Sequence, residues 1–219
     1  MQNLKRTRRD LLLGVDPSFD TMGGAIWSPD LKKLHLYQGG LDNFFLWLQD
    51  NYEVDRIVAV VEDPSQDSPT FGAWETMKNK ISGIVSSKPG ERLVAWNEAK
   101  KHFNTSMKIS QNVGENKRAA KRTITILEKM GVPIVTVKPS ERRRVDNLKE
   151  GEKRLPIQCF TMPTKTSKSQ FCDLTGYSGP SDNNARDAAT LVYKQTINWA
   201  LVKYAKQNKG EFFNEEITL

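Results

Sequence analysis

Three acidic residues lie where an apolar segment ends or a helix begins. Asp16 ends the apolar run 11–15, Glu62 ends the run 57–61, and Asp187 lies near the start of an apolar helical pattern. A carboxylate at the end of a buried strand is costly unless a cation lies beside it, because an unpaired buried charge is strongly disfavoured. Carboxylates that are distant in sequence are typical ligands of divalent ions, so these three predict a metal site.

Each of these acids also has a purely structural interpretation. Asp16 precedes Pro17 and Ser18, a combination that is typical of a turn at a strand end. Glu62 can equally be a solvated strand end, and Asp187 can stabilise a helix N-terminus through the macrodipole. The metal site is favoured over these three separate interpretations only if the fold brings the acids together.

The elements that must position these acids follow from hydrophobic periodicity and turn residues. Short apolar runs separated by tight turns predict strands, and apolar residues at helical spacing predict helices. The expected strands are 11–16, 23–27, 33–37, 56–62 and 133–137, and the expected helices are 41–52, 115–130, 169–174 and 182–206. This order predicts an α/β fold, with a mixed five-stranded sheet flanked by helices. The first three strands are expected to be antiparallel, and the rest to form β-α-β units.

The expected topology places the first and fourth strands side by side at the centre of the sheet. Their C-terminal ends then bring Asp16 and Glu62 together, and the final helix can lay Asp187 against them. The chain divides into a basic arm at 1–9, one domain at 10–206 and a tail at 207–219. Residues 65–108 read as an insertion or lid, with helical patterns near 74–84 and 94–103.

The charge of the chain favours a polyanionic partner. The sequence has 33 Lys and Arg against 26 Asp and Glu, a net charge of +7, and the basic residues cluster at 5–9, 117–122 and 142–144. A surplus of this size also serves solubility, but clustering is typical of nucleic-acid binding. On such a chain we expect Mg²⁺ or Mn²⁺, two per site, to serve phosphodiester hydrolysis.

Other classes are disfavoured by composition. Two cysteines and two histidines are too few for a typical structural zinc site. No stretch approaches the ~20 apolar residues that span a membrane. We therefore expect a cytoplasmic protein without membrane contact.

Several short motifs resemble a known family. Gly-Val-Asp-Pro-Ser at 14–18, Val-Val-Glu-Asp-Pro at 60–64 and Asn-Ala-Arg-Asp-Ala-Ala at 184–189 resemble the RuvC group of Holliday-junction resolvases, within the RNase H-like nucleases. The segment 168–177, and Gly-Val-Pro at 131–133, are similar to the bacteriophage members. The order and spacing of these motifs carry the resemblance.

The resemblance implies an RNase H-like fold and a set of metal ligands. It assigns Asp16, Glu62 and Asp187 to the catalytic metal site. The fourth ligand, one helical turn before Asp187, is acidic or histidine in relatives, whereas this chain has Asn184. An amide oxygen can still bind a hard cation, without the charge. Asp182 and Asn183 are alternative ligands at the same helix start.

The resemblance also suggests which residues contact DNA. Phe71 would stack on an unpaired base of the junction, with Trp74 as the alternative, although each can equally belong to the core. A helix that begins near Gly114 would offer its N-terminal amides and basic side chains to phosphates, unless these side chains form only a solvated face. The expected phosphate contacts are Lys117, Arg118, Lys121, Arg122, Arg142, Arg143, Arg144, Lys165 and Lys168.

The resemblance implies an endodeoxyribonuclease that resolves four-way DNA junctions in recombination and repair. A nearly two-fold symmetric junction suggests a C2 homodimer. If the chain is encoded by a phage, its compartment would be the cytoplasm of the host cell. Two alternatives remain open: another RNase H-like nuclease that acts on flaps, hybrids or duplex DNA, or a catalytically weakened protein that binds branched DNA.

Overall fold

A computed structural model describes residues 9–18, 21–66, 71–139 and 166–208 of the chain. The side chains of residues 71–77 and 109 are also outside the description. Residues 1–8 and 209–219, which include most of the expected arm and tail, fall outside it as well.

A five-stranded mixed sheet forms the centre of the molecule. Its strands are β1 (Leu11–Asp16), β2 (Met22–Ser28), β3 (Lys33–Gly39), β4 (Ile57–Glu62) and β5 (Ile134–Val137). Their order across the sheet is β3-β2-β1-β4-β5. The first three strands are antiparallel, and β4 runs parallel to both β1 and β5. The predicted α/β class and mixed sheet are confirmed, including the central pairing of the first and fourth strands.

Strand composition explains which strands are central. β1 and β4 are continuous apolar runs that are buried on both faces up to their last residue. Such runs are typical of strands covered on both sides. β3 alternates between exposed and half-buried residues and forms one edge of the sheet.

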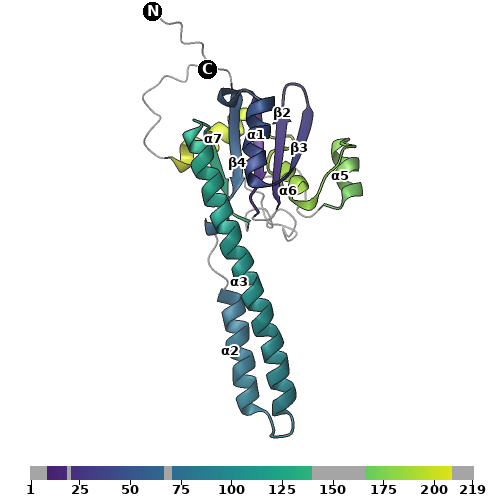
Figure 1. Ribbon diagram of the computed structural model, residues 1–219, viewed down its shortest axis with the longest axis vertical. Coiled ribbons are helices and arrows are strands. Elements are labelled where there is room, and N and C mark those ends of the chain that lie inside the picture. Colours follow the sequence, from purple (N-terminus) through teal and green to yellow (C-terminus); the bar gives the residue numbers. More distant parts are fainter. Residues whose placement is uncertain (1–8, 19–20, 67–70, 140–165, 209–219) are drawn as a thin grey trace, which may run out of the picture.

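Helices cover both faces of this sheet (Figure 1). One face packs against α1 (Leu41–Asn51) and the C-terminal part of α3 (Arg92–Lys129). The other face packs against α5 (Lys168–Thr175), α6 (Asn183–Val192) and α7 (Ile197–Gln207). Two short 3-10 helices, Val54–Arg56 and Pro64–Gln66, flank β4. The expected helices near 41–52 and 169–174 are therefore confirmed.

Most of the region that the sequence predicts to be an insertion or lid forms a long helical hairpin. α2 (Phe71–Ser86) runs antiparallel to the N-terminal part of α3 and projects away from the sheet (Figure 1). The two helical patterns expected near 74–84 and 94–103 are present. The prediction that a separate helix starts near Gly114 is wrong, because α3 is continuous from Arg92. Gly114 lies in the interior of α3, where no atom lies within 4 Å of the position that a Cβ atom would take.

The final helix is interrupted, which corrects the prediction of one helix over 182–206. α6 ends at Val192 and α7 begins at Ile197, after Lys194 adopts a positive φ of 58°. The Thr196 side chain caps the second helix by accepting from the Trp199 amide. Trp27 Nε1 donates to the backbone oxygen of Gln195 at 3.1 Å, so the break is anchored to the sheet. No glycine or proline marks this break in the sequence.

Within the described ranges, no helix is both long and apolar enough to cross a membrane.

Candidate functional site

Asp16 and Glu62 end neighbouring parallel strands on the same face of the sheet. Val15 pairs with Val61, so the two acids are the next residues along adjacent strands, which lie about 4.8 Å apart. Side chains alternate along a strand, and Leu12 and Val60 both belong to the core under α6 and α7. Asp16 and Glu62 therefore both face the side that these helices cover. The predicted meeting of these acids at the C-terminal ends of the two central strands agrees with the register.

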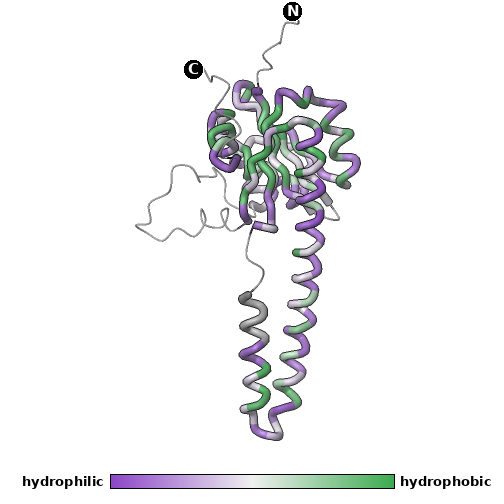
Figure 2. Tube along the Cα trace, turned by 90° about the vertical axis from the view of Figure 1, so that its left-hand side faces the viewer, coloured by the Kyte–Doolittle hydropathy of each residue, from purple (hydrophilic) through white to green (hydrophobic). Residues whose placement is uncertain are grey.

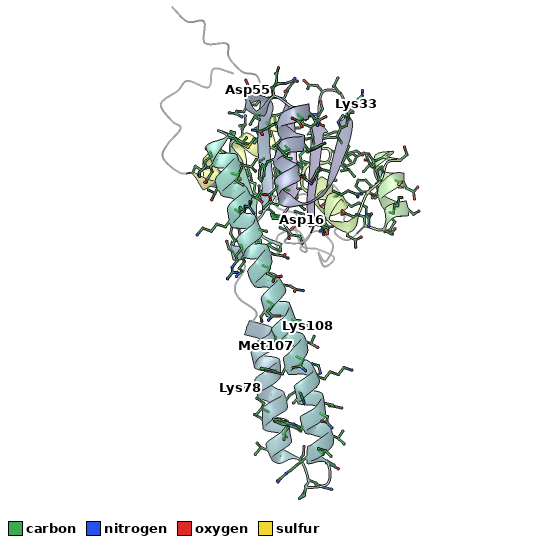
Figure 3. All side chains as sticks on the ribbon, viewed as in Figure 1. Asp16, Lys33, Asp55, Lys78, Met107 and Lys108 are labelled. Atoms are coloured by element: carbon green, nitrogen blue, oxygen red, sulfur yellow. The ribbon has the colours of Figure 1, made fainter. Side chains whose placement is uncertain are left out.

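The C-terminal ends of β1 and β4 lie at the end of the domain from which the hairpin of α2 and α3 projects. Figure 3 marks Asp16 there, whereas Lys33 and Asp55 mark the opposite end of the sheet. Both acids are partly exposed, unlike the fully buried residues before them. Solutes can therefore reach them from outside.

Two glycines allow α6 to lie directly on the sheet beside Asp16. A Cβ atom added to Gly23 would overlap the backbone oxygen of Asn184, and one added to Gly14 would overlap that of Ala188. Gly23 is also the cross-strand partner of Asp16. The first turns of α6 are thus in backbone contact with the strand residue opposite Asp16. This contact brings the segment 184–187 to the predicted site.

The side chain of Asn184 is anchored to the loop before β2. Its Nδ2 donates to the backbone oxygen of Thr21 at 2.5 Å and to Thr21 Oγ1 at 2.8 Å. No described residue donates a hydrogen bond to Asn184 Oδ1. Since the amide nitrogen faces Thr21, the amide oxygen faces away from it and is the atom that a cation could bind.

Asp182 and Asp187 hold different places on the same helix. Asp182 is the N-cap of α6, and its Oδ1 accepts from the Ala185 amide at 2.7 Å. Asp187 is half-buried and immediately precedes Ala188, whose backbone contacts Gly14. The structure therefore gives Asp182 a capping role, whereas the role of Asp187 as a metal ligand stays a prediction.

Arg186 forms a buried clamp that sequence reading missed. Its Nε donates to the Thr166 backbone oxygen at 3.1 Å, and Nη1 donates to the Ser181 backbone oxygen at 2.8 Å. Nη2 donates to Asn183 Oδ1. Arg186 is only 7% exposed, and a buried guanidinium is tolerated when acceptors surround it. The clamp joins the chain before α5 to the start of α6. A charged residue within an otherwise buried helix face was its signal in the sequence.

Asp63 fixes the backbone just after Glu62. Its Oδ1 accepts from the Ser65 amide at 2.9 Å and from Ser65 Oγ at 2.6 Å. Its own amide donates to the Val137 backbone oxygen at 2.8 Å. Asp63 is buried, and its side chain closes the turn that follows β4, which holds Glu62 at the sheet edge.

The donors at this edge suit a hard divalent cation. Asp16, Glu62 and Asp187 supply carboxylates, and Asn184 supplies an amide oxygen, which are ligand types that Mg²⁺ and Mn²⁺ prefer. Among the residues that the structure describes, no three or more His, Cys, Asp or Glu side chains form a group that could hold a metal ion. The donor chemistry fits, and the assembly of these side chains around a metal stays a prediction.

The expected DNA contacts are distributed unevenly. Arg118, Lys121 and Arg122 are exposed on the side of α3 turned away from the buried Ala120, Thr123 and Leu127. Lys117 is half-buried and lies beside the buried face, three residues before Ala120. Arg122 also pairs with Asp42, with 2.8 Å between Nη2 and Oδ1. The amides near Gly114 lie inside the helix, so the expected N-terminal phosphate site is wrong.

The other expected contacts are only partly described. Lys168 is exposed at the first residue of α5. Arg142, Arg143, Arg144 and Lys165 lie outside the described residues, and so does the side chain of Phe71.

No protein-family model matches the chain, and no curated protein matches it. The resemblance to junction resolvases therefore rests on the short motifs and their order.

A separate pocket of about 400 Å³ lies where β1 begins, away from the acids. Its wall includes Asp10 and Arg56, which are joined by two hydrogen bonds of 2.9 and 2.6 Å. The hydrogen bonds that Arg56 donates to the Asp10 carboxylate raise the pKa of Arg56. His35 Nδ1 and the Tyr52 hydroxyl lie 2.7 Å apart in the same wall. None of Asp16, Glu62, Asn184 and Asp187 lines this pocket, so it is not part of the candidate site.

Proposed function

We propose that this protein is a metal-dependent endodeoxyribonuclease that cuts branched DNA, with four-way junctions as its main substrate. The observation that carries the proposal is the placement of Asp16 and Glu62 at the ends of adjacent parallel strands, on the face covered by α6. An RNase H-like fold is part of the proposal. It is supported by the strand order β3-β2-β1-β4-β5, with three antiparallel strands followed by parallel ones.

Asp16, Glu62 and Asp187 would hold Mg²⁺ or Mn²⁺, with the amide oxygen of Asn184 as a neutral fourth donor. Divalent ions at such a site supply an activated water and neutralise charge on the scissile phosphate. Gly23 is the strand partner of Asp16, and it supports this arrangement because its missing side chain leaves room for the backbone of Asn184. Arg186 would keep the start of α6 in position through its contacts with Thr166, Ser181 and Asn183.

Phosphate binding is assigned to the outer side of α3. Lys117, Arg118, Lys121 and Arg122 present four cations over about one and a half helical turns. Phosphate contacts do not depend on the DNA sequence, and they make the affinity for DNA fall steeply as the salt concentration rises. Since a four-way junction offers two equivalent strands, a homodimer would place one site on each strand.

A second candidate function is binding of branched DNA with weakened catalysis. It is favoured by the hydrogen bond from Asn184 Nδ2 to the Thr21 backbone oxygen. An ionised carboxylate at position 184 could not donate this bond. The amide thus serves the architecture at a position where a charged metal ligand is expected.

Cleavage of a synthetic four-way junction, measured against linear duplex, a flap and an RNA–DNA hybrid with Mg²⁺ present, tests the proposal. Asp16→Asn and Glu62→Gln should each abolish cleavage while junction binding persists. Asp50→Asn changes an exposed acid on α1 and should cleave normally. Cleavage that survives both site variants would overturn the site assignment. A wild-type protein that cuts the flap or the hybrid best would instead identify another RNase H-like nuclease.

The binding-only alternative predicts a different outcome. Wild-type protein would bind the junction without cutting it at any Mg²⁺ or Mn²⁺ concentration. Asn184→Asp would then gain neither metal affinity nor cleavage. If the nuclease proposal holds, the same variant should bind the metal more tightly, because a carboxylate replaces a neutral oxygen.

A further inference from the structure

The α2–α3 hairpin, meaning α2 together with residues 92–113 of α3, buries very little of its own apolar surface. Between residues 78 and 118, Ala99 is the only described side chain that is buried. Two helices that project from a domain are marginally stable unless an apolar face is covered. Apolar residues nevertheless recur along both helices (Figure 2). The hairpin therefore carries apolar side chains that its own fold does not use.

On α3 these side chains form one stripe with the spacing of a coiled coil. Leu93, Trp96, Lys100, Phe103 and Met107 follow one another by three and four residues in alternation. This spacing places them on one side of the helix. The apolar members are exposed by 71%, 58%, 45% and 47% in that order. The stripe is thus a helix-pairing pattern that α2 does not cover.

α2 carries a matching stripe. Lys78, Ile81 and Val85 show the same spacing, and Ile81 and Val85 are 50% and 75% exposed. The residues turned toward the partner helix are different ones, Ile84 on α2 and Ala99 on α3, which are half-buried and buried. Successive residues of an α-helix are about 100° apart around the helix axis. On each helix the stripe follows the contact side by one residue, so the stripe lies about 100° from the contact side around the axis. Because the two helices are antiparallel, both stripes open on the same side of the hairpin.

We propose that this side of the hairpin, the paired stripe, docks against the paired stripe of a second copy of the chain to form an intermolecular four-helix bundle. The exposed apolar members, with side chains of about 150–250 Å², present on the order of 700 Å². Stable dimers bury roughly 800 Å² per partner. The paired stripe therefore supplies most of the surface that a homodimer needs. This inference stands whether or not the protein cuts DNA.

Charge separates this surface from a DNA-binding one. Lys101 and Lys108 lie about 100° or more away from the stripe by helical geometry, on the other side of α3. Met107 and Lys108, both marked in Figure 3, thus belong to different sides of the hairpin. The paired stripe itself has one lysine per helix among apolar residues. Phosphate binding would need the opposite composition.

Lys78 and Lys100 occupy corresponding positions in the two stripes. Counted from the loop at 87–91, each is separated from the hairpin tip by two apolar members, Ile81 and Val85 on α2, Leu93 and Trp96 on α3. Two docked copies would bring these lysines close to one another. Like charges there weaken the bundle, while a single polar layer selects its register. Salt should therefore strengthen self-association, which is the reverse of its effect on DNA binding.

Sedimentation equilibrium of the full chain without DNA tests the proposal. Wild-type protein should be dimeric, and Leu93→Glu should weaken the dimer by at least about tenfold. Val94→Glu is the matched control, because Val94 is 63% exposed but points away from the stripe. Lys100→Leu should tighten the dimer. Far-ultraviolet circular dichroism checks that each variant keeps its helices.

Several outcomes would overturn the proposal. A monomeric wild type at about 100 μM would do so, since specific dimers form well below that concentration. Equal effects of Leu93→Glu and Val94→Glu, or a dimer unchanged by Leu93→Glu, would place the interface elsewhere. If Trp96→Ala and Lys100→Leu weaken duplex binding but leave the oligomeric state unchanged, the surface serves DNA instead.

Discussion

The backbone oxygen of Asn184 lies where the side chain of residue 23 would begin, so the absence of a side chain at Gly23 positions α6. Gly23 needs no unusual backbone conformation, since its φ is not among the positive ones. Its role is spatial: it lets a helix backbone contact a strand beside Asp16. Gly14 on the neighbouring strand β1 likewise leaves room for the backbone of Ala188.

Gly23→Ala should therefore displace α6 from the sheet. We expect a loss of about 1–3 kcal/mol in the free energy of unfolding, which is typical of overpacking a core. Urea denaturation measures this loss. The cleavage rate should fall further than stability explains, because Asp187 moves with the helix. An unchanged urea midpoint would show that α6 adjusts without cost.

Gly114→Ala should have the opposite effect. Gly114 lies inside α3 with no atom near the added Cβ, so alanine gains helix propensity at no steric cost. The expected gain is about 0.5–1 kcal/mol, measured in the same denaturation experiment. Gly83→Ala on α2 should behave alike. A destabilised Gly114→Ala protein would contradict a continuous α3.

Arg186→Lys should not preserve the clamp at the start of α6. A lysine keeps the charge but cannot reach the acceptors on Thr166, Ser181 and Asn183 with one ammonium group. We expect a loss of about 3 kcal/mol, because buried carbonyl groups lose their donors. Thermal unfolding measures it. Arg118→Lys, which changes an exposed arginine, serves as the control and should leave the melting temperature unaltered.

Alkaline pH should destabilise the protein through its partly buried tyrosines. Burial raises the pKa values of Tyr37, Tyr52 and Tyr177. In the unfolded chain a tyrosine ionises near pH 10. The stability that these groups contribute is thus fully present below about pH 10, and it is lost as pH rises through their folded pKa values. Urea midpoints should fall over that interval, and Tyr52→Phe should reduce the fall.

The sheet and the pairing of Asp16 with Glu62 could be predicted because strand signals are local. Two continuous apolar runs, each ending in an acid, indicate central strands before any contact is known. The amphipathic α1 was predicted for the same reason. The neighbouring positions of the first and fourth strands then followed from a common α/β arrangement.

The helix boundaries could not be predicted because they depend on tertiary contacts. Lysine is not a residue type that marks a helix break, yet the chain turns at Lys194 and places Gln195 against Trp27. Gly114 resembles a helix end but lies inside the continuous helix α3, with open space around it. The clamp of Arg186 depends on Thr166, which is distant in sequence.

The continuity of α3 has a consequence for how the hairpin can change length. One rod of 38 residues, about 57 Å long, passes from the hairpin tip to the sheet without a joint. Adding seven residues to each hairpin helix would extend its reach by about 10 Å while turning its faces by only about 20°. The hairpin can thus grow or shrink in units of two turns, with the sheet and its acidic edge left untouched.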